Sequence, residues 1–271
     1  MPGLNITRFD YTDVEQHSQV IDEMLRGERT GVIVRRVFEP EFMAEVATRL
    51  QDTSLHRYDC EQWKGQTFGR PLIVWENDLA PYFRDGIAFT ASCAALFQGG
   101  PDYQRRIEDL LSRLGGGRPV EVPRGPDSSP YLASSIRQVD DGEILVHCEN
   151  ETIDFPGMRH LSTLIDRTTQ LSYYLTLSVA DRGGELMVYG LRFGEGAGRE
   201  LDRMERLSTA TVHFLERFGC EVMDAGVGDL LIFDAGRHFH RVARPEGPRA
   251  RRTMGGFLAA SRDRSKIFYW S

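Results

Sequence analysis

Three things are scarce in this sequence: long apolar runs, basic charge and closely spaced cysteines. No stretch approaches the roughly 18 apolar residues of a transmembrane helix. The 33 basic side chains are outnumbered by 40 acidic ones, which gives a formal charge of −7. Sequence-independent nucleic-acid binding depends on Lys and Arg neutralising phosphates, so this deficit argues against it. We therefore expect neither a membrane nor a nucleic acid as the partner.

The four cysteines are widely scattered and include no C-x-x-C pair. In a chain of this length such spacing indicates reduced thiols rather than a disulfide framework. The first ten residues lack the basic-then-apolar pattern of a signal peptide. Together these features predict a soluble, cytoplasmic protein.

The composition provides enough apolar material for one sizeable core. Hydrophobic residues make up 41% of the 271 positions and charged residues 27%, as in an ordinary globular domain, and we expect a single domain over residues 1–271. Residues 1–117 are expected to form a mainly helical part with one β-branched strand at 31–38. Apolar spacing predicts its helices at 14–26, 40–50, 88–97 and 103–114.

The character of the sequence changes at about residue 118. Four prolines between 119 and 130 interrupt any helix and mark a surface connection. Beyond them, short apolar runs between turn residues predict strands at 135–139, 143–147, 171–179, 184–189, 229–233 and 253–259, with one helix at 208–218. Regular short strands are typical of a sandwich or barrel. We therefore predict a mainly β fold with flanking helices, in which the helical part packs on a core at 118–271.

A candidate metal site begins at the end of the strand at 143–147. His147 is followed two residues later by Glu149, and residues i and i+2 of a strand project from the same face. With a second imidazole from elsewhere, this pair would complete a two-His, one-carboxylate triad, which binds non-haem Fe(II) and leaves other positions open. Alone, His-x-Glu is a weak motif, because most such pairs are solvated strand residues.

The second imidazole can come from the segment after residue 228, where a strand holds both His238 and His240. The two compete for the role, because they are expected on the same strand face. Arg251 and Arg252 follow at the start of the last predicted strand. An arginine there can hold a dicarboxylate by a two-pronged salt bridge. The order of His147, Glu149, His240 and an arginine is far more specific than any one of its parts.

These residues resemble those of the Fe(II)/2-oxoglutarate-dependent oxygenases. More narrowly, the sequence resembles the subgroup of hapalindole- and welwitindolinone-type alkaloid halogenases over most of its length. The resemblance is carried by the strings at 96–103, 118–126, 170–174, 183–189 and 249–259. It implies a double-stranded β-helix (jelly-roll, cupin-like) core with Fe(II) at one mouth, and 2-oxoglutarate and O2 as co-substrates.

The resemblance also implies site residues. His147 and His240 would be iron ligands, with His240 preferred over His238 by its position. Arg251 would bind the distal carboxylate of 2-oxoglutarate, with Arg252 as the alternative, because neighbouring strand residues face opposite ways. The helices before residue 118 and the segment 63–83 are expected to cover the mouth of the barrel.

The sequence departs from the halogenases at Glu149, where they have a glycine that leaves a ligand position vacant for halide. A carboxylate restores the ordinary oxygenase triad, so we predict hydroxylation of an unactivated C–H bond in secondary metabolism. A halogenase, a desaturase or cyclase, and a non-catalytic metal-binding jelly-roll remain alternatives. The relatives imply a small-molecule substrate, alkaloid-like or amino-acid-derived, and we expect a monomer or homodimer.

Further candidates line the predicted strands and the segment before them. Arg137 either faces inward to meet an anion or is a surface residue. Tyr173 and Tyr174 are neighbours on one strand, and one of them is expected to hydrogen-bond 2-oxoglutarate. Pocket-lining aromatic side chains are proposed at Phe68, Trp75 and Tyr82, although aromatic residues there are more often plain core.

Overall fold

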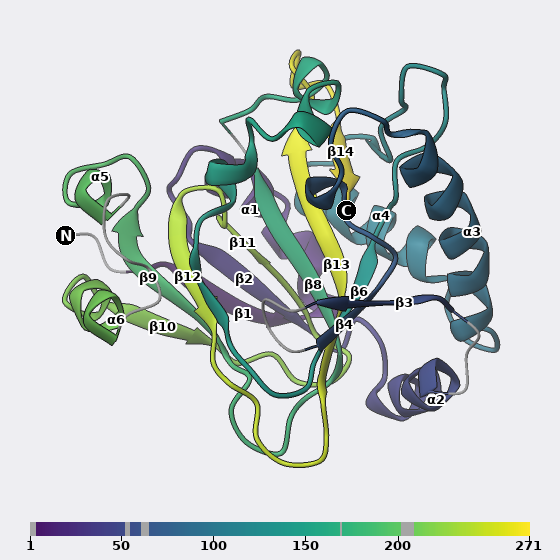
Figure 1. Ribbon diagram of the computed structural model, residues 1–271, viewed down its shortest axis with the longest axis horizontal. Coiled ribbons are helices and arrows are strands. Elements are labelled where there is room, and N and C mark those ends of the chain that lie inside the picture. Colours follow the sequence, from purple (N-terminus) through teal and green to yellow (C-terminus); the bar gives the residue numbers. More distant parts are fainter. Residues whose placement is uncertain (1–3, 52–54, 61–64, 169, 202–208) are drawn as a thin grey trace.

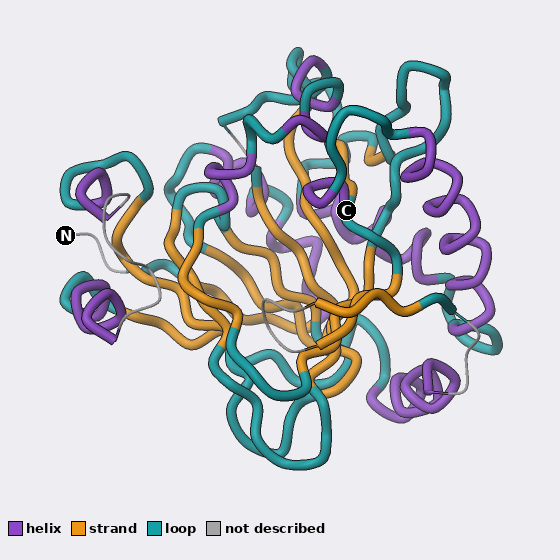
Figure 2. The backbone as a smooth tube through the Cα atoms, viewed as in Figure 1, coloured by secondary structure: helices purple, strands orange, loops and turns teal. Residues whose placement is uncertain are grey.

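The computed structural model describes residues 4–51, 55–60, 65–168, 170–201 and 209–271, and in this part of the chain two β-sheets face each other. The large sheet has the strand order β1-β2-β11-β8-β13-β6-β4-β3, with β14 beside β13 and β5 beside β14. The small sheet has the order β10-β9-β12-β7. Figures 1 and 2 show both sheets at the centre of the molecule with helices on either side. The predicted jelly-roll core is confirmed.

The strands of the large sheet come from the whole length of the chain. They are β1 (Ile6–Asp10), β2 (Gly31–Arg35), β3 (Arg57–Cys60), β4 (Gly65–Phe68), β5 (Val120–Glu121), β6 (Ser135–Val139), β8 (Leu171–Ser178), β11 (Leu230–Phe233), β13 (Arg251–Ala260) and β14 (Ile267–Trp270). The small sheet contains β7 (Ile144–His147), β9 (Leu186–Arg192), β10 (Cys220–Met223) and β12 (His238–Val242). Most neighbouring strands pair antiparallel, whereas β1 pairs parallel with β2 and β5 with β14.

The helices pack on the outer faces of the two sheets. They are α1 (Val20–Leu25), α2 (Pro40–Gln51), α3 (Ala80–Leu96), α4 (Tyr103–Leu114), α5 (Gly198–Leu201) and α6 (Thr209–Glu216). Figure 1 places α2, α3 and α4 on one side of the sheets and α5 and α6 on the other. Within the described residues, no helix is long and apolar enough to cross a membrane.

Three apolar clusters hold these layers together. The largest joins α1 to α4 to the outer face of the large sheet, where Tyr173, Leu175 and Met254 point. A second fills the space between the sheets and includes Val188 and Phe233. A third covers the outer face of the small sheet below α5 and α6. Burial of these side chains is the main term that stabilises the fold.

Two expectations for the N-terminal part were wrong. Residues 1–117 contribute four strands to the large sheet, at both of its edges, where one strand was expected. The helix expected at 14–26 is divided into a 3-10 helix (Tyr11–His17) and α1, with a turn that lets both Val14 and the apolar face of α1 reach the core. By contrast, α2 and α4 match their predicted ranges to within a residue.

Candidate metal centre

Two neighbouring strands of the small sheet place the two predicted histidines side by side. His240 on β12 is the direct cross-strand partner of His147 on β7. Their ring centroids are 4.1 Å apart, and residues opposite each other on an antiparallel pair project from the same face. The pairing therefore brings together two imidazoles that are far apart in the sequence.

Glu149 joins them from just beyond the end of β7. The strand stops at His147, and Glu149 begins a 3-10 helix (Glu149–Thr152) in which its backbone N–H donates to the carbonyl of Ala235 at 3.0 Å. Its Oε1 lies 3.7 Å from Nε2 of His147 and 3.9 Å from Nε2 of His240. The carboxylate thus reaches the imidazoles through a turn rather than through the alternation of a continuous strand, as the sequence had suggested.

The backbone sets the orientation of both imidazoles. Nδ1 of His147 lies 2.6 Å from the carbonyl of Leu145, and Nδ1 of His240 lies 2.9 Å from the carbonyl of His238. A carbonyl can only accept, so each Nδ1 donates its proton and each Nε2 keeps its lone pair. Proteins commonly orient a metal-binding histidine by such a hydrogen bond from the ring nitrogen that does not bind the metal.

The charge states also suit a cation. Burial by itself would raise the pKa of Glu149, but the neighbouring His147 and the more distant Arg137 hold it below its ordinary value. Burial and the neighbouring His147 lower the pKa of His240 to about 3. Two nitrogens and one ionised carboxylate oxygen, all within 4.8 Å of one another, are the donor set that non-haem Fe(II) takes. The residues present therefore fit this metal.

His238 lies outside this cluster. A register shift in the pairing of β12 with β9 separates it from His240, although both side chains are buried. Its Nδ1 faces the carbonyl of Tyr189 at 2.8 Å, and its Nε2 has no hydrogen-bond partner among the described residues. The irregularity explains why two residues expected on one strand face have different surroundings.

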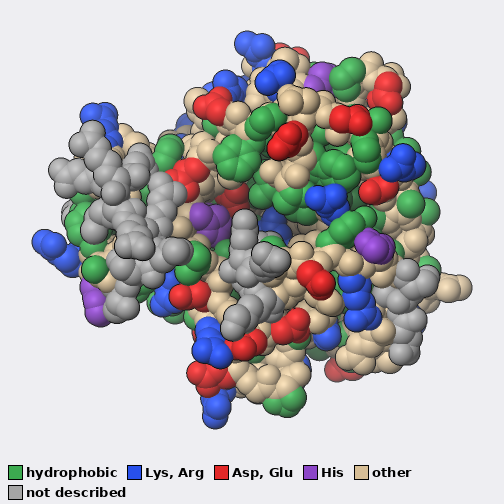
Figure 3. Space-filling model, in the orientation of Figure 1, with side chains coloured by type: hydrophobic (Ala, Val, Ile, Leu, Met, Phe, Trp, Pro, Cys, Tyr) green, Lys and Arg blue, Asp and Glu red, His purple; other side chains and the backbone are tan. Residues whose placement is uncertain are grey.

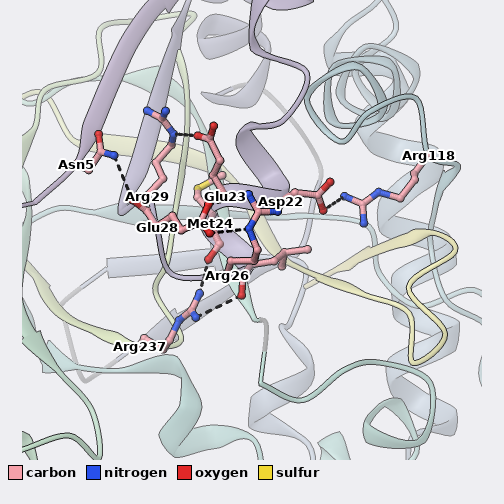
Figure 4. Close-up of polar contacts among 10 residues, drawn as sticks. Asn5, Asp22, Glu23, Met24, Arg26, Glu28, Arg29, Arg118 and Arg237 are labelled. Atoms are coloured by element: carbon pink, nitrogen blue, oxygen red, sulfur yellow. Dashed lines mark hydrogen bonds and ion pairs between the residues drawn. The ribbon is translucent and has the colours of Figure 1, made fainter.

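Side-chain hydrogen bonds connect the turn before His238 to α1. The sequence alone did not indicate this contact. Arg237 donates from Nε to Asp234 at 2.7 Å and from its two terminal nitrogens to the backbone carbonyls of Met24 and Leu25. Figure 4 shows this guanidinium reaching the end of α1. The backbone carbonyl of Asp234 in turn accepts the backbone N–H of His238, whose own carbonyl orients His240. A chain of contacts therefore runs from α1 to the metal centre.

A small cavity of about 30 Å³ opens beside the two histidines. The large sheet contributes two guanidiniums and two hydroxyls to its wall, and the small sheet contributes apolar side chains. The lining residues are Arg137, Ile144, His147, Tyr174, Leu186, His240, Val242, Arg251 and Thr253. In Figure 3, histidine, acidic and basic side chains come together at a hollow near the middle of the face drawn.

Strand alternation separates the arginine and tyrosine candidates. Arg251 and Tyr174 line the cavity. Arg252 does not, and its Nε donates to Oε1 of Gln138 at 2.6 Å. Tyr173 points into the helix-side core, where its hydroxyl donates to the carbonyl of Ala133 at 2.8 Å. The register of β8 and β13 thus determines which residue of each neighbouring pair faces the cavity, which the sequence alone left open.

The expected lid is placed differently. α3 and α4 pack on the outer face of the large sheet and do not cover the cavity mouth. Phe68 and Tyr82 are buried in that helix-side core, and the Tyr82 hydroxyl donates to the carbonyl of Ser271. Trp75 packs at the edge of this core, and the guanidinium carbon of Arg70 lies 4.4 Å from the centroid of the Trp75 ring. Residues 63 and 64 of the expected cover lie outside the described residues.

Solved structures share this fold at low sequence identity. An N-substituted L-amino acid dioxygenase from Burkholderia ambifaria AMMD is 17% identical, with a TM-score of 0.57 and coverage of 93% of this chain and 91% of that one. The form in complex with alpha-KG is 19% identical (TM-score 0.56; 93% and 90% covered). A 2OG-Fe(II) oxygenase family oxidoreductase from Burkholderia pseudomallei is 13% identical over the full length of both chains, with a TM-score of 0.50.

Among curated protein sequences, none matches this chain. A family model does: that of the carrier-protein-independent halogenase WelO5 matches residues 4–271. With the fold of the 2-oxoglutarate oxygenases and a donor set suited to Fe(II), the protein is an enzyme of the Fe(II)/2-oxoglutarate oxygenase superfamily that uses O2. Because the match spans nearly the whole sequence, the chain belongs to the carrier-protein-independent halogenase WelO5 family.

Proposed function

We propose that this enzyme hydroxylates an unactivated C–H bond of a small molecule in secondary metabolism. In this proposal His147, Glu149 and His240 hold Fe(II). The observation that carries it is the buried Glu149 carboxylate, whose Oε1 lies within 4 Å of the Nε2 atoms of both histidines. Bound Fe(II) together with 2-oxoglutarate and O2 supplies the oxidation of the C–H bond.

Glu149 decides between hydroxylation and halogenation because it sets what else the metal can bind. The side chain is 4% exposed and its backbone is fixed to Ala235. A carboxylate held there would take the metal position that chloride or bromide needs in a halogenase. The glycine of the related halogenases would leave that position open, so this one residue favours transfer of oxygen over transfer of halogen.

Arg251 is proposed to bind the distal carboxylate of 2-oxoglutarate. Burial lowers the pKa of its guanidinium to about 10, which still leaves it charged at neutral pH. The Tyr174 hydroxyl and the Thr253 hydroxyl line the same cavity and can donate to a carboxylate oxygen. Arg252, bonded to Gln138 and outside the cavity, is not assigned this role.

Halogenation is the second candidate, and the observation that favours it is the match to the halogenase family model. The two candidates differ in their need for halide. A halogenase needs chloride or bromide at the metal, whereas the proposed hydroxylase ignores both.

The test combines a binding measurement with product analysis. Under anaerobic conditions, the melting temperature of the Fe(II)- and 2-oxoglutarate-loaded protein is followed against chloride and bromide, for the unmutated chain and for Glu149→Gly, with Glu149→Asp as the control that keeps a carboxylate. We expect a halide-dependent shift only in Glu149→Gly.

Product mass is then measured with a panel of small molecules in the presence of chloride. The unmutated chain is expected to add one oxygen atom, and Glu149→Gly to give at most partial halogenation, because a halide site also needs surrounding donors. A halogenated product from the unmutated chain would contradict the proposal, since it would show that Glu149 does not occupy the metal.

A further inference from the structure

A second guanidinium, that of Arg137, lies in the same cavity as Arg251. We propose that Arg137 binds an anionic group of the primary substrate, which makes that substrate a small carboxylate with an apolar body. This inference rests on the proposed function, in which Arg251 takes the distal carboxylate of 2-oxoglutarate.

Arg137 and Arg251 project into the cavity from different strands, β6 and β13. Arg137 is the cross-strand partner of Thr253, and its guanidinium carbon lies 5.3 Å from the ring centroid of Tyr174 and 5.7 Å from that of Phe257. It thus extends along β13 toward Phe257. The stem of Arg251 lies toward the opposite end of β13, where a Cβ on Gly184 would meet its Cδ at 3.2 Å. The two side chains therefore leave the backbone at different positions along the cavity wall.

Arg137 has no anionic partner of its own in the described part of the chain. Its one hydrogen bond to a side chain there runs from Nη1 to the Tyr174 hydroxyl at 3.0 Å. Burial would lower its pKa, but Tyr174 and the more distant Glu149 hold it above its ordinary value. The residue is therefore a half-buried, charged guanidinium with donors to spare, and a charge withdrawn from water is costly unless it is paired.

The charges of the loaded site leave room for one more anion. Fe(II) and the two guanidiniums carry four positive charges, whereas Glu149 and the dianionic co-substrate carry three negative ones. In the proposed arrangement the co-substrate uses its distal carboxylate at Arg251 and its keto-acid end at the metal. Arg137 is the cation that remains, and a monocarboxylate would neutralise it.

The surroundings of Arg137 define the occupant further. Its guanidinium lies near the rings of Tyr174 and Phe257, and such contacts fix the orientation of its planar fork. A fixed fork recognises a carboxylate by two parallel hydrogen bonds, which a neutral amide cannot reproduce. The aromatic rings beside it offer apolar surface to the rest of the molecule. We therefore expect an acid to be preferred over its amide of the same shape.

The first measurement separates Arg137 from the co-substrate. Binding of 2-oxoglutarate to the Fe(II)-loaded protein without oxygen is measured by calorimetry for the unmutated chain, Arg137→Met, Arg251→Met and the control Arg252→Met. We expect Arg251→Met to raise the Kd of 2-oxoglutarate at least tenfold, and Arg137→Met to change it less than threefold. An increase of tenfold or more in Arg137→Met would overturn the inference, because it would place Arg137 on the co-substrate.

The second measurement uses matched acids and amides as probes of the substrate site. The melting temperature of the loaded anaerobic protein is recorded with 4-phenylbutyrate, indole-3-acetate and N-acetyl-L-leucine, each against its primary amide. We expect at least one acid to stabilise the unmutated chain more than its amide does. Arg137→Met should abolish that difference and Arg137→Lys should restore part of it. If no acid exceeds its amide, or if the difference survives in Arg137→Met, the inference is wrong.

Two controls keep the outcomes distinct. Arg137→Gln keeps a donor for the Tyr174 hydroxyl but removes the charge, and it replaces Arg137→Met if that variant does not fold. Failure of the unmutated chain to bind Fe(II) or 2-oxoglutarate would count against the proposed function. An acid preference that depends on Arg137 would still support the binding role of this residue.

Discussion

The two sheets of this molecule contribute different chemistry to one cavity. The small sheet presents His147 and His240 on paired strands, with Glu149 on the turn that follows. The large sheet presents the cationic and hydroxyl side chains of β6, β8 and β13. In the proposed function, metal ligation and anion binding are therefore built on separate layers whose side chains meet at this cavity.

The two layers also differ in how they are held. The large sheet is packed on its outer face by α1 to α4, and its strands come from both halves of the chain. The small sheet has a smaller apolar cluster behind it, and its metal-facing groups depend on side-chain bonds to backbone carbonyls. This contrast teaches that metal affinity and co-substrate affinity should be separable by mutation.

The largest effect is expected in the small sheet. His147→Ala and His240→Ala should each weaken Fe(II) binding by more than about 100-fold, because changes to residues that merely orient a metal ligand already cost about 10–100-fold. His238→Ala removes an imidazole about as buried as that of His240 and leaves the His238 carbonyl that orients His240, so it should bind iron nearly as well as the unmutated chain. Calorimetric titration with Fe(II) measures both, and loss of iron in His238→Ala alone would reverse the ligand assignment.

The next effect belongs to the large sheet. Arg251→Met should raise the Kd of 2-oxoglutarate at least tenfold while leaving Fe(II) affinity intact, because a charge-assisted bond contributes about 1.5–3 kcal/mol. Arg252→Met removes a guanidinium from the other face of β13 and should change that Kd less than threefold. A larger loss in Arg252→Met would mean that the facing of β13 is opposite to the one described.

A smaller effect is expected where the first helix contacts the small sheet. Arg237→Met leaves Asp234 buried without its partner and frees the carbonyls at the end of α1, so unfolding free energy should fall by about 2 kcal/mol. Fe(II) affinity should fall by a few-fold, because the turn before His240 loosens. The control is Arg26→Met on the same helix end, whose exposed pair with Glu28 should leave the melting temperature unchanged. Equal effects in the two variants would contradict a positioning role for Arg237.

The smallest effect is a pH dependence at the same turn. Burial raises the pKa of Asp234 to about 6, despite the opposing Arg237, so between about pH 4 and pH 6 the folded state binds this proton more tightly than the unfolded state. Its contribution to stability therefore falls as pH rises through that window, by up to about 1.4 kcal/mol for each pH unit. Denaturant unfolding of the unmutated chain and of Asp234→Asn across pH 4–7 should show a flatter curve for the variant, and parallel curves would refute the assignment.

Much of the fold could be predicted because local patterns determine it. α4 begins after the N-cap Asp102 and ends at Gly115, as its apolar spacing indicated. The short strands β3, β4 and β14 were not predicted, because their pairing with distant strands rather than their own composition makes them strands.

At the site, too, some features follow from local sequence and others depend on contacts with distant parts of the chain. The identities of His147, Glu149 and His240 follow from their order in the sequence and from the family resemblance. Whether Arg251 or Arg252 faces the cavity depends on the strand register, and the function of Arg237 depends on carbonyls more than 200 residues away. Neither leaves a local signal in the sequence.

The pairing of β7 with β12 has one further consequence. β7 is the terminal strand of the small sheet, and a terminal strand with one partner is where local opening and edge-to-edge association begin. A metal held by both His147 and His240 would cross-link this strand to its neighbour. Amide hydrogens of β7 should then exchange more slowly in the iron-loaded protein, and iron supply would govern how long the chain survives proteolysis and aggregation.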